Sequence, residues 1–247
     1  MSDRHTPDFG ALASVYDALR PTDAAWWERF AALVELGDLR GRRVLDVGCG
    51  TGRLAAALAE RAQAKVWGID SSAEMVAVAR AAVPRGVGIR VGEAERLPFR
   101  DGWFDRVTLS LVLHLVDRPA VLAEARRVVA DSGRVVIGTF HPDHFASYWL
   151  NDLFPSIRSI DEVRFPSGET IEAELGAAGF SRVETVRLTI EQQISKDVAL
   201  ARIRGRHIST FDLLPADELD EGTSRAASVL PDTVVTRLDQ LIVVGFG

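Results

Sequence analysis

A short apolar strand that runs into three alternating glycines constrains this chain more than any other segment. Residues 44–52 read Val-Leu-Asp-Val-Gly-Cys-Gly-Thr-Gly. Because glycine has no Cβ, backbone N–H groups in such a turn can approach a small ligand closely before the chain enters a helix. The segment therefore predicts a ligand site at the end of the first strand of an α/β sheet.

The residues around the glycines indicate which ligand this turn holds. Dinucleotide-binding turns carry glycine at the first, third and sixth positions. Here Gly48 and Gly50 fill the first two, but the sixth position is Arg53. The carboxylate of Asp46, just upstream, would repel a diphosphate and attract an ammonium group. The pattern favours a ligand that joins an amino acid to a nucleoside, and it disfavours the alternative of a nicotinamide-dependent oxidoreductase.

At these residues, and at later motifs in the expected order, the sequence resembles the class I S-adenosylmethionine (SAM) dependent methyltransferases. The resemblance covers roughly residues 9–140. It is strongest to the small-molecule branch that includes the ubiquinone/menaquinone biosynthesis and trans-aconitate methyltransferases. It implies SAM as cofactor and in-line methyl transfer to an oxygen, carbon or nitrogen of a small-molecule acceptor. A glycine turn reports only a ligand, so a SAM-binding scaffold or regulator without transfer activity is a second hypothesis.

Strand and helix patterns alternate from residue 42 onward, as a doubly wound sheet requires. We expect a Rossmann-like seven-stranded sheet, and the resemblance implies an antiparallel last strand. The expected strands are residues 44–47, 65–69, 87–91, 104–110, 134–140, 183–190 and 241–246. Helices are expected over residues 54–62, 71–82, 120–130, 168–178 and 199–215, with another ending at 230.

The chain is expected to be one methyltransferase domain over residues 1–247. Two helices, one beginning at Thr6-Pro7 and one over residues 22–37, precede the first strand and so lie outside the alternating core. The resemblance implies that these N-terminal helices, within residues 1–40, cap the SAM pocket. Residues 41–140 then form the SAM-binding core, and residues 141–247 form a substrate-side excursion and complete the sheet.

The expected cofactor-binding residues follow the strand ends and the first helix. Asp70, 18 residues after Gly52, ends the second strand, where an acid can accept from both ribose hydroxyls. The resemblance implies that Tyr16 closes over the methionine end and that Arg20 pairs with its carboxylate, although both could simply belong to an amphipathic helix. The full expected set is Tyr16, Arg20, Asp46, Gly48, Cys49, Gly50, Asp70, Ser71, Met75, Glu93, Ala94 and Ser110.

Three residues are candidates for a catalytic role: His141, His114 and Tyr16. His141 opens the excursion after the fifth strand, and either it or His144 could be a general base, since imidazole titrates near neutrality. The pair could instead hold a metal or lie on an exposed loop. His114 occupies a position that is usually His in the resembled family, and a structural role is the alternative. Aromatic residues in the excursion suit an uncharged or aromatic acceptor.

Composition and charge argue against several other classes of protein. A single cysteine, Cys49, rules out an internal disulfide and a multi-thiolate zinc site, and we expect no metal. The net charge of -6 and the absence of a dense basic cluster argue against nucleic acid as a partner. No apolar run reaches the ~18 residues that span a bilayer, and the first residues are polar, so we expect a cytoplasmic protein without stable membrane insertion. Nothing indicates the oligomeric state.

Overall fold

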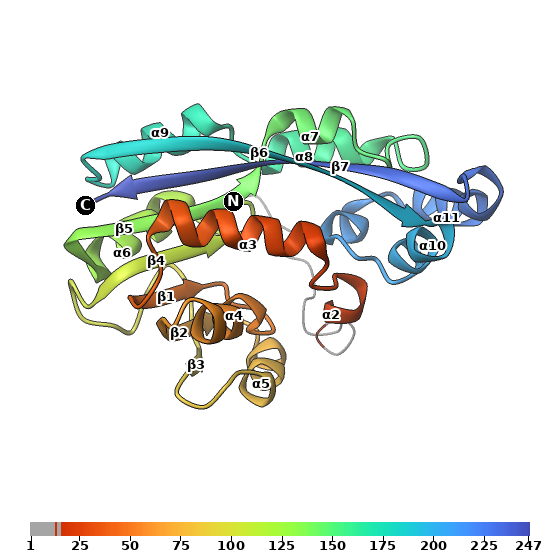
Figure 1. Ribbon diagram of the computed structural model, residues 1–247. Coiled ribbons are helices and arrows are strands. Elements are labelled where there is room, and N and C mark those ends of the chain that lie inside the picture. Colours follow the sequence, from red (N-terminus) through yellow and green to blue (C-terminus); the bar gives the residue numbers. More distant parts are fainter. Residues whose placement is uncertain (1–12, 14–15) are drawn as a thin grey trace.

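A single mixed sheet organises the computed structural model, which describes Ala13 and residues 16–247. Within this described part, seven strands lie in the order β3-β2-β1-β4-β5-β7-β6 (Figure 1). β1 to β5 are parallel, and β7 is antiparallel to both β5 and β6, so the predicted fold class is confirmed. The strands are β1 Arg43–Val47, β2 Lys65–Asp70, β3 Gly88–Val91, β4 Phe104–Ser110, β5 Val129–Phe140, β6 Arg182–Ser195 and β7 Thr233–Phe246.

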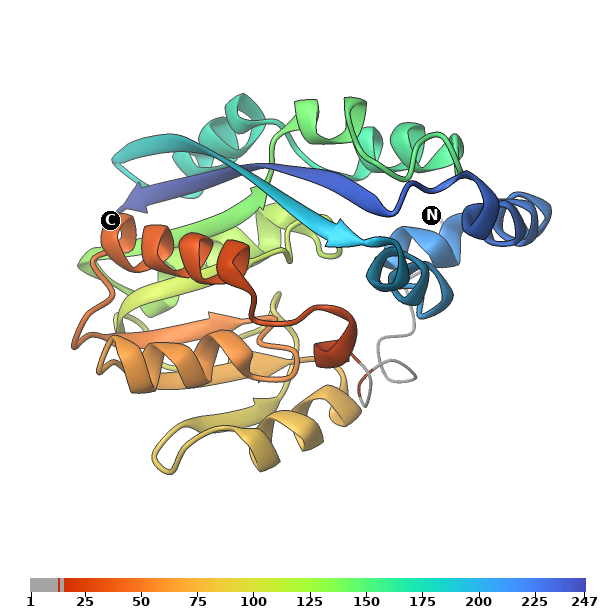
Figure 2. The same cartoon turned by 45° about the vertical axis from the view of Figure 1, so that its right-hand side comes forward.

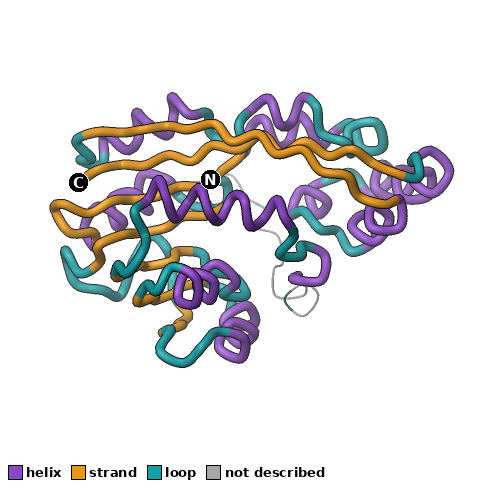
Figure 3. The backbone as a smooth tube through the Cα atoms, in the orientation of Figure 1, coloured by secondary structure: helices purple, strands orange, loops and turns teal. Residues whose placement is uncertain are grey.

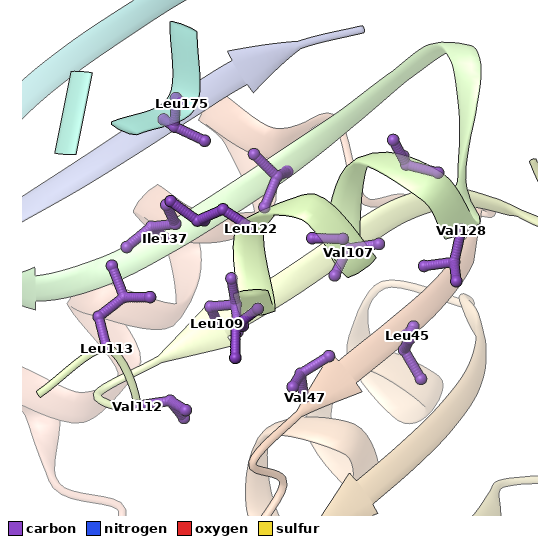
Figure 4. Packing of buried hydrophobic residues seen from close by; sticks show 14 of the residues in the cluster. Leu45, Val47, Val107, Leu109, Val112, Leu113, Leu122, Val128, Ile137 and Leu175 are labelled. Carbon is purple, nitrogen blue, oxygen red and sulfur yellow. The ribbon is translucent and has the colours of Figure 1, made fainter. Parts of the chain in front are cut away.

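Helices cover both faces of the sheet (Figure 1). Helices α3 (Ala24–Gly37) and α4 (Arg53–Arg61) pack on one face, with α5 (Ala73–Ala82) beside α4, while α6 (Arg118–Val128) and α9 (Gly168–Ala177) pack on the other. Successive strand residues therefore face opposite cores: Val44 packs with α3 and α4, whereas Leu45 packs with α6 (Figure 4). No helix among the described residues is long and apolar enough to cross a membrane.

The last two strands are longer than expected and support a second, smaller core. β6 and β7 pair over their full length, from Arg182–Phe246 to Ser195–Thr233, and run beyond the rest of the sheet (Figure 2). The predicted ranges 183–190 and 241–246 were too short, because buried polar residues such as Thr236 and Gln240 interrupt the apolar pattern of β7. Around the extension lie α8 (Ser156–Arg164), α10 (Lys196–Arg204), the short 3₁₀ helix η1 (Ser209–Leu213) and α11 (Ala216–Val229).

Several helix boundaries differ from the expectation for local reasons (Figure 3). The predicted start of the first helix, at Thr6-Pro7, lies outside the described residues. Within the described residues, this region contains the short helix α2 (Tyr16–Leu19). Helix α6 begins earlier than residue 120 because the Asp117 carboxylate caps it. Helix α5 begins at Ala73, later than the expected residue 71, because Ser72 caps it: the Ser72 hydroxyl accepts from the Met75 N–H at 3.2 Å. The excursion contains α7 (Pro142–Ala146) as well as α8.

Candidate functional site

A cavity of about 420 Å³ opens at the edge of the sheet where β1, β2 and β4 end. Carboxyl edges of doubly wound sheets commonly hold ligands, and the volume lies within the ~300–1,000 Å³ of small-molecule sites. We call its two parts the sheet half and the helical half. The sheet half is lined by Asp46, Gly48, Cys49, Gly50, Asp70, Ser71, Met75, Glu93, Ala94 and Ser110. The helical half is lined by His114, Phe140, His144, Phe145, Tyr148, Trp149, Asp161, Phe165, Arg202, His207, Thr210 and Gln240.

The glycine turn forms the floor of the sheet half. Gly48, Gly50 and Gly52 all have positive φ, at 68°, 53° and 79°, which side-chain-bearing residues adopt only with strain. A Cβ on Gly48 would lie 2.3 Å from Val112, so this position also lacks space. A Cβ on Gly50 would meet nothing within 4 Å, because that side faces the cavity. The turn therefore presents bare backbone to a ligand, as predicted from the sequence.

Asp46 lies buried beside this turn with half of its carboxylate unsatisfied. Its Oδ1 accepts from the Thr108 hydroxyl at 2.8 Å, while its Oδ2 is buried and has no hydrogen-bond partner among the residues that the structure describes. Burial raises the pKa of Asp46 to about 7, and the nearby Asp70 charge adds to this effect. A buried carboxylate oxygen without a donor is costly unless a ligand completes it. An ammonium group at this point would supply both the missing donor and the opposite charge.

Asp70 is held in a fixed orientation at the end of β2. Its Oδ2 accepts from the Gly50 N–H at 2.8 Å and its Oδ1 accepts from the Ser72 N–H at 2.9 Å. Each carboxylate oxygen has a second lone pair, so both remain able to accept from a pair of hydroxyls. The N–H of Gly92 donates to the Asp70 carbonyl at 2.9 Å, which brings the following Glu93 to the same wall. A sugar diol and a nitrogenous base fit these neighbouring acceptors.

Helix α2 covers the open side of the glycine turn. The Thr51 hydroxyl donates to the Asp17 carboxylate at 2.8 Å, and the Arg53 guanidinium donates to the Arg20 carbonyl. The guanidinium of Arg20 lies over the Tyr16 ring, 3.9 Å from its centroid, and burial lowers the pKa of Arg20. Tyr16 and Arg20 thus line the cavity because Asp17 attaches their helix to the turn. All twelve residues expected to bind cofactor meet in this one cavity.

Comparison with known proteins decides the family of this chain. A family model described as a methyltransferase domain matches residues 45–137. The demethylmenaquinone methyltransferase of Thermus thermophilus is 34% identical over 202 residues, which cover 70% of this chain and 91% of the relative. The ubiquinone/menaquinone biosynthesis C-methyltransferase UbiE of Citrifermentans bemidjiense is 31% identical over 211 residues, covering 73% and 89%. The chain belongs to the class I SAM-dependent methyltransferases.

A solved structure extends the similarity over the fold. A proposed methyltransferase of an antibiotic biosynthesis pathway from Anabaena variabilis superposes with a TM-score of 0.74. It covers 87% of this chain and 96% of its own, at 22% sequence identity, and so supports the fold alone. Together with the sequence relatives, these findings confirm the predicted family, cofactor and reaction: the protein is an enzyme that transfers a methyl group from SAM to a small molecule.

The histidines of this methyltransferase are not arranged as the sequence suggested. His141 is absent from the cavity lining; it caps α7, where its Nδ1 accepts from the Asp143 N–H at 3.1 Å. The structure therefore gives no support to its expected role as general base. His114 does line the cavity, stacked on Phe165 at 4.0 Å between ring centroids, and burial lowers its pKa to about 3. His114 is thus a neutral imidazole.

Two other histidines in the cavity have their tautomers fixed by backbone carbonyls. His144 Nδ1 lies 3.2 Å from the Arg237 carbonyl, and His207 Nδ1 lies 3.1 Å from the Arg202 carbonyl. A carbonyl can only accept, so we assign the proton to Nδ1 in both rings. Burial lowers the pKa of His144 to about 4 and that of His207 to about 3. Each Nε2 is then an acceptor, and Tyr148 Oη lies 3.4 Å from that of His207.

Sequence reasoning missed Arg29, Asp161, Arg202 and His207 as cavity residues. Arg29, on α3, lines the wall near Ser110, and burial lowers its pKa to about 10, with the Arg53 charge adding to this effect. Asp161 accepts from Thr210 at 2.8 Å and from Arg164 at 3.1 Å. These residues come from parts of the chain where no motif marks them. Asp161 and Arg202 lie on the polar helices α8 and α10 and His207 follows α10 in a loop, so no sequence pattern distinguishes them from surface residues.

The His-x-x-His pair of the excursion does not form a metal centre with its neighbours. Within the residues that the structure describes, no group of three or more His, Cys, Asp or Glu side chains is placed to hold a metal ion. His141 and His144 each use Nδ1 in a hydrogen bond with the backbone. The acidic residues of the cavity are instead arranged around the glycine turn and Arg164. Their chemistry suits ligand binding.

Proposed function

We propose that this methyltransferase binds SAM along the sheet half of the cavity and its acceptor in the helical half. The observation that carries this proposal is the unpartnered Oδ2 of Asp46 beside the open glycine turn. It fits the ammonium of the methionine end, while Asp70 fits the ribose hydroxyls and Glu93 with Ala94 fits the adenine edge. When bound, SAM supplies an electrophilic methyl group carried on a sulfonium.

Arg29 and Tyr16 complete the methionine end in this proposal. Arg29 has no side-chain hydrogen bond or ion pair within the described residues, and it lies on the wall that also includes Ser110 and Leu54. The carboxylate of the ligand would neutralise this cation, which sits beside the second cation of Arg53. Tyr16 would close over the same end from α2. Ser71 and Met75 would flank the adenine from the start of α5.

The protein's contribution to the reaction is mainly alignment. Phe140, Phe145 and Trp149 would exclude water and orient the acceptor toward the end of β4. Alignment of this kind contributes ~7–11 kcal/mol to lowering a barrier. Proton removal by a side chain adds ~10²- to 10⁴-fold where the acceptor must lose a proton. His144, neutral and with no hydrogen bond to its Nε2 from the described residues, takes the place of His141 as the candidate acceptor of that proton.

The relatives carry names for several acceptors, and we do not transfer a particular one to this chain. A demethylmenaquinone methyltransferase and a malonyl-[acyl-carrier protein] O-methyltransferase are both similar to it at 34% and 35% identity. The name of the second specifies oxygen as the methylated atom, whereas the UbiE relative is named a C-methyltransferase. Most of the helical half comes from residues after the segment 45–137 that the methyltransferase family model matches, and we propose that this half decides the acceptor.

We also propose that the enzyme acts in the cytoplasm on free small molecules. The net charge of -6 and the lack of a dense basic cluster in the sequence support an acceptor other than nucleic acid. The single cysteine gives no sign of an oxidising compartment.

The test of this function is a product screen with SAM that carries an isotopically labelled methyl group. The enzyme is incubated with pools of small-molecule acceptors, and products are detected by mass. We expect a labelled product together with S-adenosylhomocysteine. Tight binding of SAM with no labelled product across a broad panel would favour the non-catalytic scaffold instead.

A further inference from the structure

A short helix carries two side chains of the helical half. Helix α7 spans five residues, Pro142–Ala146, and both His144 and Phe145 line the cavity. Its side-chain cap is the bond from the Asp143 N–H to Nδ1 of His141. A helix of this length does not persist on its own, because too few hydrogen bonds offset the cost of ordering its backbone. Contacts with other elements therefore decide where His144 lies.

A buried carboxylate on β7 organises the contacts that α7 makes with the sheet. The side chain of Asp239 is 1% exposed and accepts from the Thr189 hydroxyl at 2.7 Å, from Arg187 Nη2 at 2.9 Å and from Arg237 Nε at 2.7 Å. Burial opposes ionisation, but the hydrogen bonds from Arg237, Thr189 and Arg187 hold the pKa of Asp239 well below its usual range. We call these four residues the Asp239 cluster, and its carboxylate stays charged at neutral pH.

Arg187 joins this cluster to α7. Its Nη2 donates to Asp239, while its Nη1 lies 2.9 Å from Oδ2 of Asp143. The rigid fork of a guanidinium can hold two carboxylates in a fixed geometry. Asp143 is 61% exposed, and an isolated ion pair at such a position is weak. Here the buried pair with Asp239 fixes the guanidinium, so Asp143 meets a partner that is already in place.

Two backbone carbonyls of β7 hold the histidines of this segment. The His141 N–H donates to the Asp239 carbonyl at 2.9 Å, and the protonated Nδ1 of His144 lies 3.2 Å from the Arg237 carbonyl. The His144 ring is also stacked on Phe140, with 4.2 Å between centroids. Its Nε2 is then left as a hydrogen-bond acceptor, to which no described residue donates. The position of α7 on β7 thus sets both the tautomer and the orientation of His144.

The Asp239 cluster lies just outside the cavity. Gln240 lines the cavity, whereas its neighbour Asp239 does not, because successive residues of a strand face opposite sides. Arg187 and Asp143 are also absent from the lining. These groups do not touch a ligand in the cavity. Their effect on the reaction therefore passes through α7.

We propose that Arg187 is a positioning residue for methyl transfer, which pairs Asp143 on α7 with Asp239 on β7 and so holds Nε2 of His144 toward the acceptor. This inference rests on the proposed function, which places the acceptor in the helical half. The proton of the acceptor passes to Nε2, and the electron pair of its former bond stays on the acceptor atom. That atom attacks the methyl carbon, and the S–CH₃ electron pair stays on sulfur.

The first experiment observes His144 directly in the enzyme saturated with S-adenosylhomocysteine. Long-range ¹H–¹⁵N NMR distinguishes the two imidazole tautomers and follows their titration, and His144→Gln assigns the signals. We expect the parent ring to carry its proton on Nδ1 and to titrate near its pKa of about 4. In Arg187→Met and in Asp143→Asn the tautomers should mix, and the ring should titrate closer to the ordinary value of ~6.5. Unchanged His144 signals in both variants would overturn the proposal.

The second experiment measures turnover with an acceptor that loses a proton. Arg187→Met and Asp143→Asn should each lower kcat about tenfold, while the affinity for S-adenosylhomocysteine stays within a factor of about two. Arg187→Lys keeps a cation at this position and should recover part of the loss. The matched control is Arg182→Met, which removes an exposed arginine of the same strand paired with Glu184 at 3.1 Å. It should change neither kcat nor the His144 signals.

The two variants separate positioning from stability. Asp143→Asn leaves the Asp239 cluster intact, so it tests the contact with α7 even if Arg187→Met unfolds. A purely structural role would lower the midpoint of denaturation and leave kcat of the folded enzyme unchanged, and that result would contradict the inference. Loss of S-adenosylhomocysteine binding by the parent would instead contradict the proposed function.

Discussion

Replacing Asp46 by asparagine should make the protein more stable and its cofactor binding weaker. Burial raises the pKa of this carboxyl from 3.8 to about 7. The folded state therefore penalises the ionised form, and this penalty is absent below pH ~4 and grows as the pH rises to about 7. Each pKa unit corresponds to ~1.4 kcal/mol, so the full penalty at pH 8 is about 4 kcal/mol.

Asparagine removes the penalty but adds a smaller one. Its Oδ1 can still accept from the Thr108 hydroxyl, whereas its amide occupies the buried position where Asp46 Oδ2 has no partner. An unpaired buried donor costs ~1–3 kcal/mol. The free energy of unfolding of Asp46→Asn at pH 8 should therefore exceed that of the parent by about 1–3 kcal/mol. Chemical denaturation of the ligand-free protein measures this difference.

The same substitution should weaken the binding of S-adenosylhomocysteine by about tenfold or more, because the side chain that faces the ammonium of the ligand loses its negative charge. In the parent, affinity should rise about fivefold between pH 6 and pH 7 as Asp46 ionises, while the ligand amine stays protonated. In the variant this rise should disappear. Asp152→Asn, at an exposed carboxylate, is the control and should change neither property. A variant that is less stable, or one that binds the ligand as tightly as the parent, would refute the reasoning.

Three further substitutions test other parts of the site. Asp70→Ala should weaken SAM binding by at least ~1 kcal/mol through the loss of two ribose hydrogen bonds, measured by calorimetry; unchanged affinity would remove Asp70 from the site. Gly48→Ala places a Cβ 2.3 Å from Val112 at a φ of 68° and should lower the free energy of unfolding by more than ~1 kcal/mol in a denaturant titration, with wild-type stability as the contrary outcome. His141→Ala should retain turnover with the identified acceptor, since His141 lies outside the cavity lining, and a large loss would restore it as a base.

The sheet half of the cavity was predictable from the sequence because short local patterns fix the positions of its residues. Gly48 and Gly50 are demanded by positive φ, and Asp46 and Asp70 stand at fixed offsets from the glycine turn and the end of β2. Each of these signals lies within a few residues of sequence. The structure accordingly brings all the expected cofactor residues into one cavity, although their individual roles remain predictions.

The helical half of the cavity could not be predicted in the same way. His207 and Arg202 reach the cavity only because β6 and β7 extend and place α10 against the end of α2, a long-range arrangement without a local pattern. His141 shows how a local cap redirects a side chain. It directly follows a strand at the correct edge of the sheet, yet the cap of α7 turns its imidazole toward Asp143. Position along the chain predicts the edge, whereas the direction of a side chain depends on local caps.

The central claim is that the pocket beside β1 binds the methionine end and the nucleoside of SAM. Isothermal titration calorimetry of the folded chain with S-adenosylhomocysteine and, separately, with NAD⁺ tests it most directly. We predict saturable binding of one S-adenosylhomocysteine per chain and no measurable binding of NAD⁺ at the same concentrations. Binding of NAD⁺ without binding of S-adenosylhomocysteine would contradict the account.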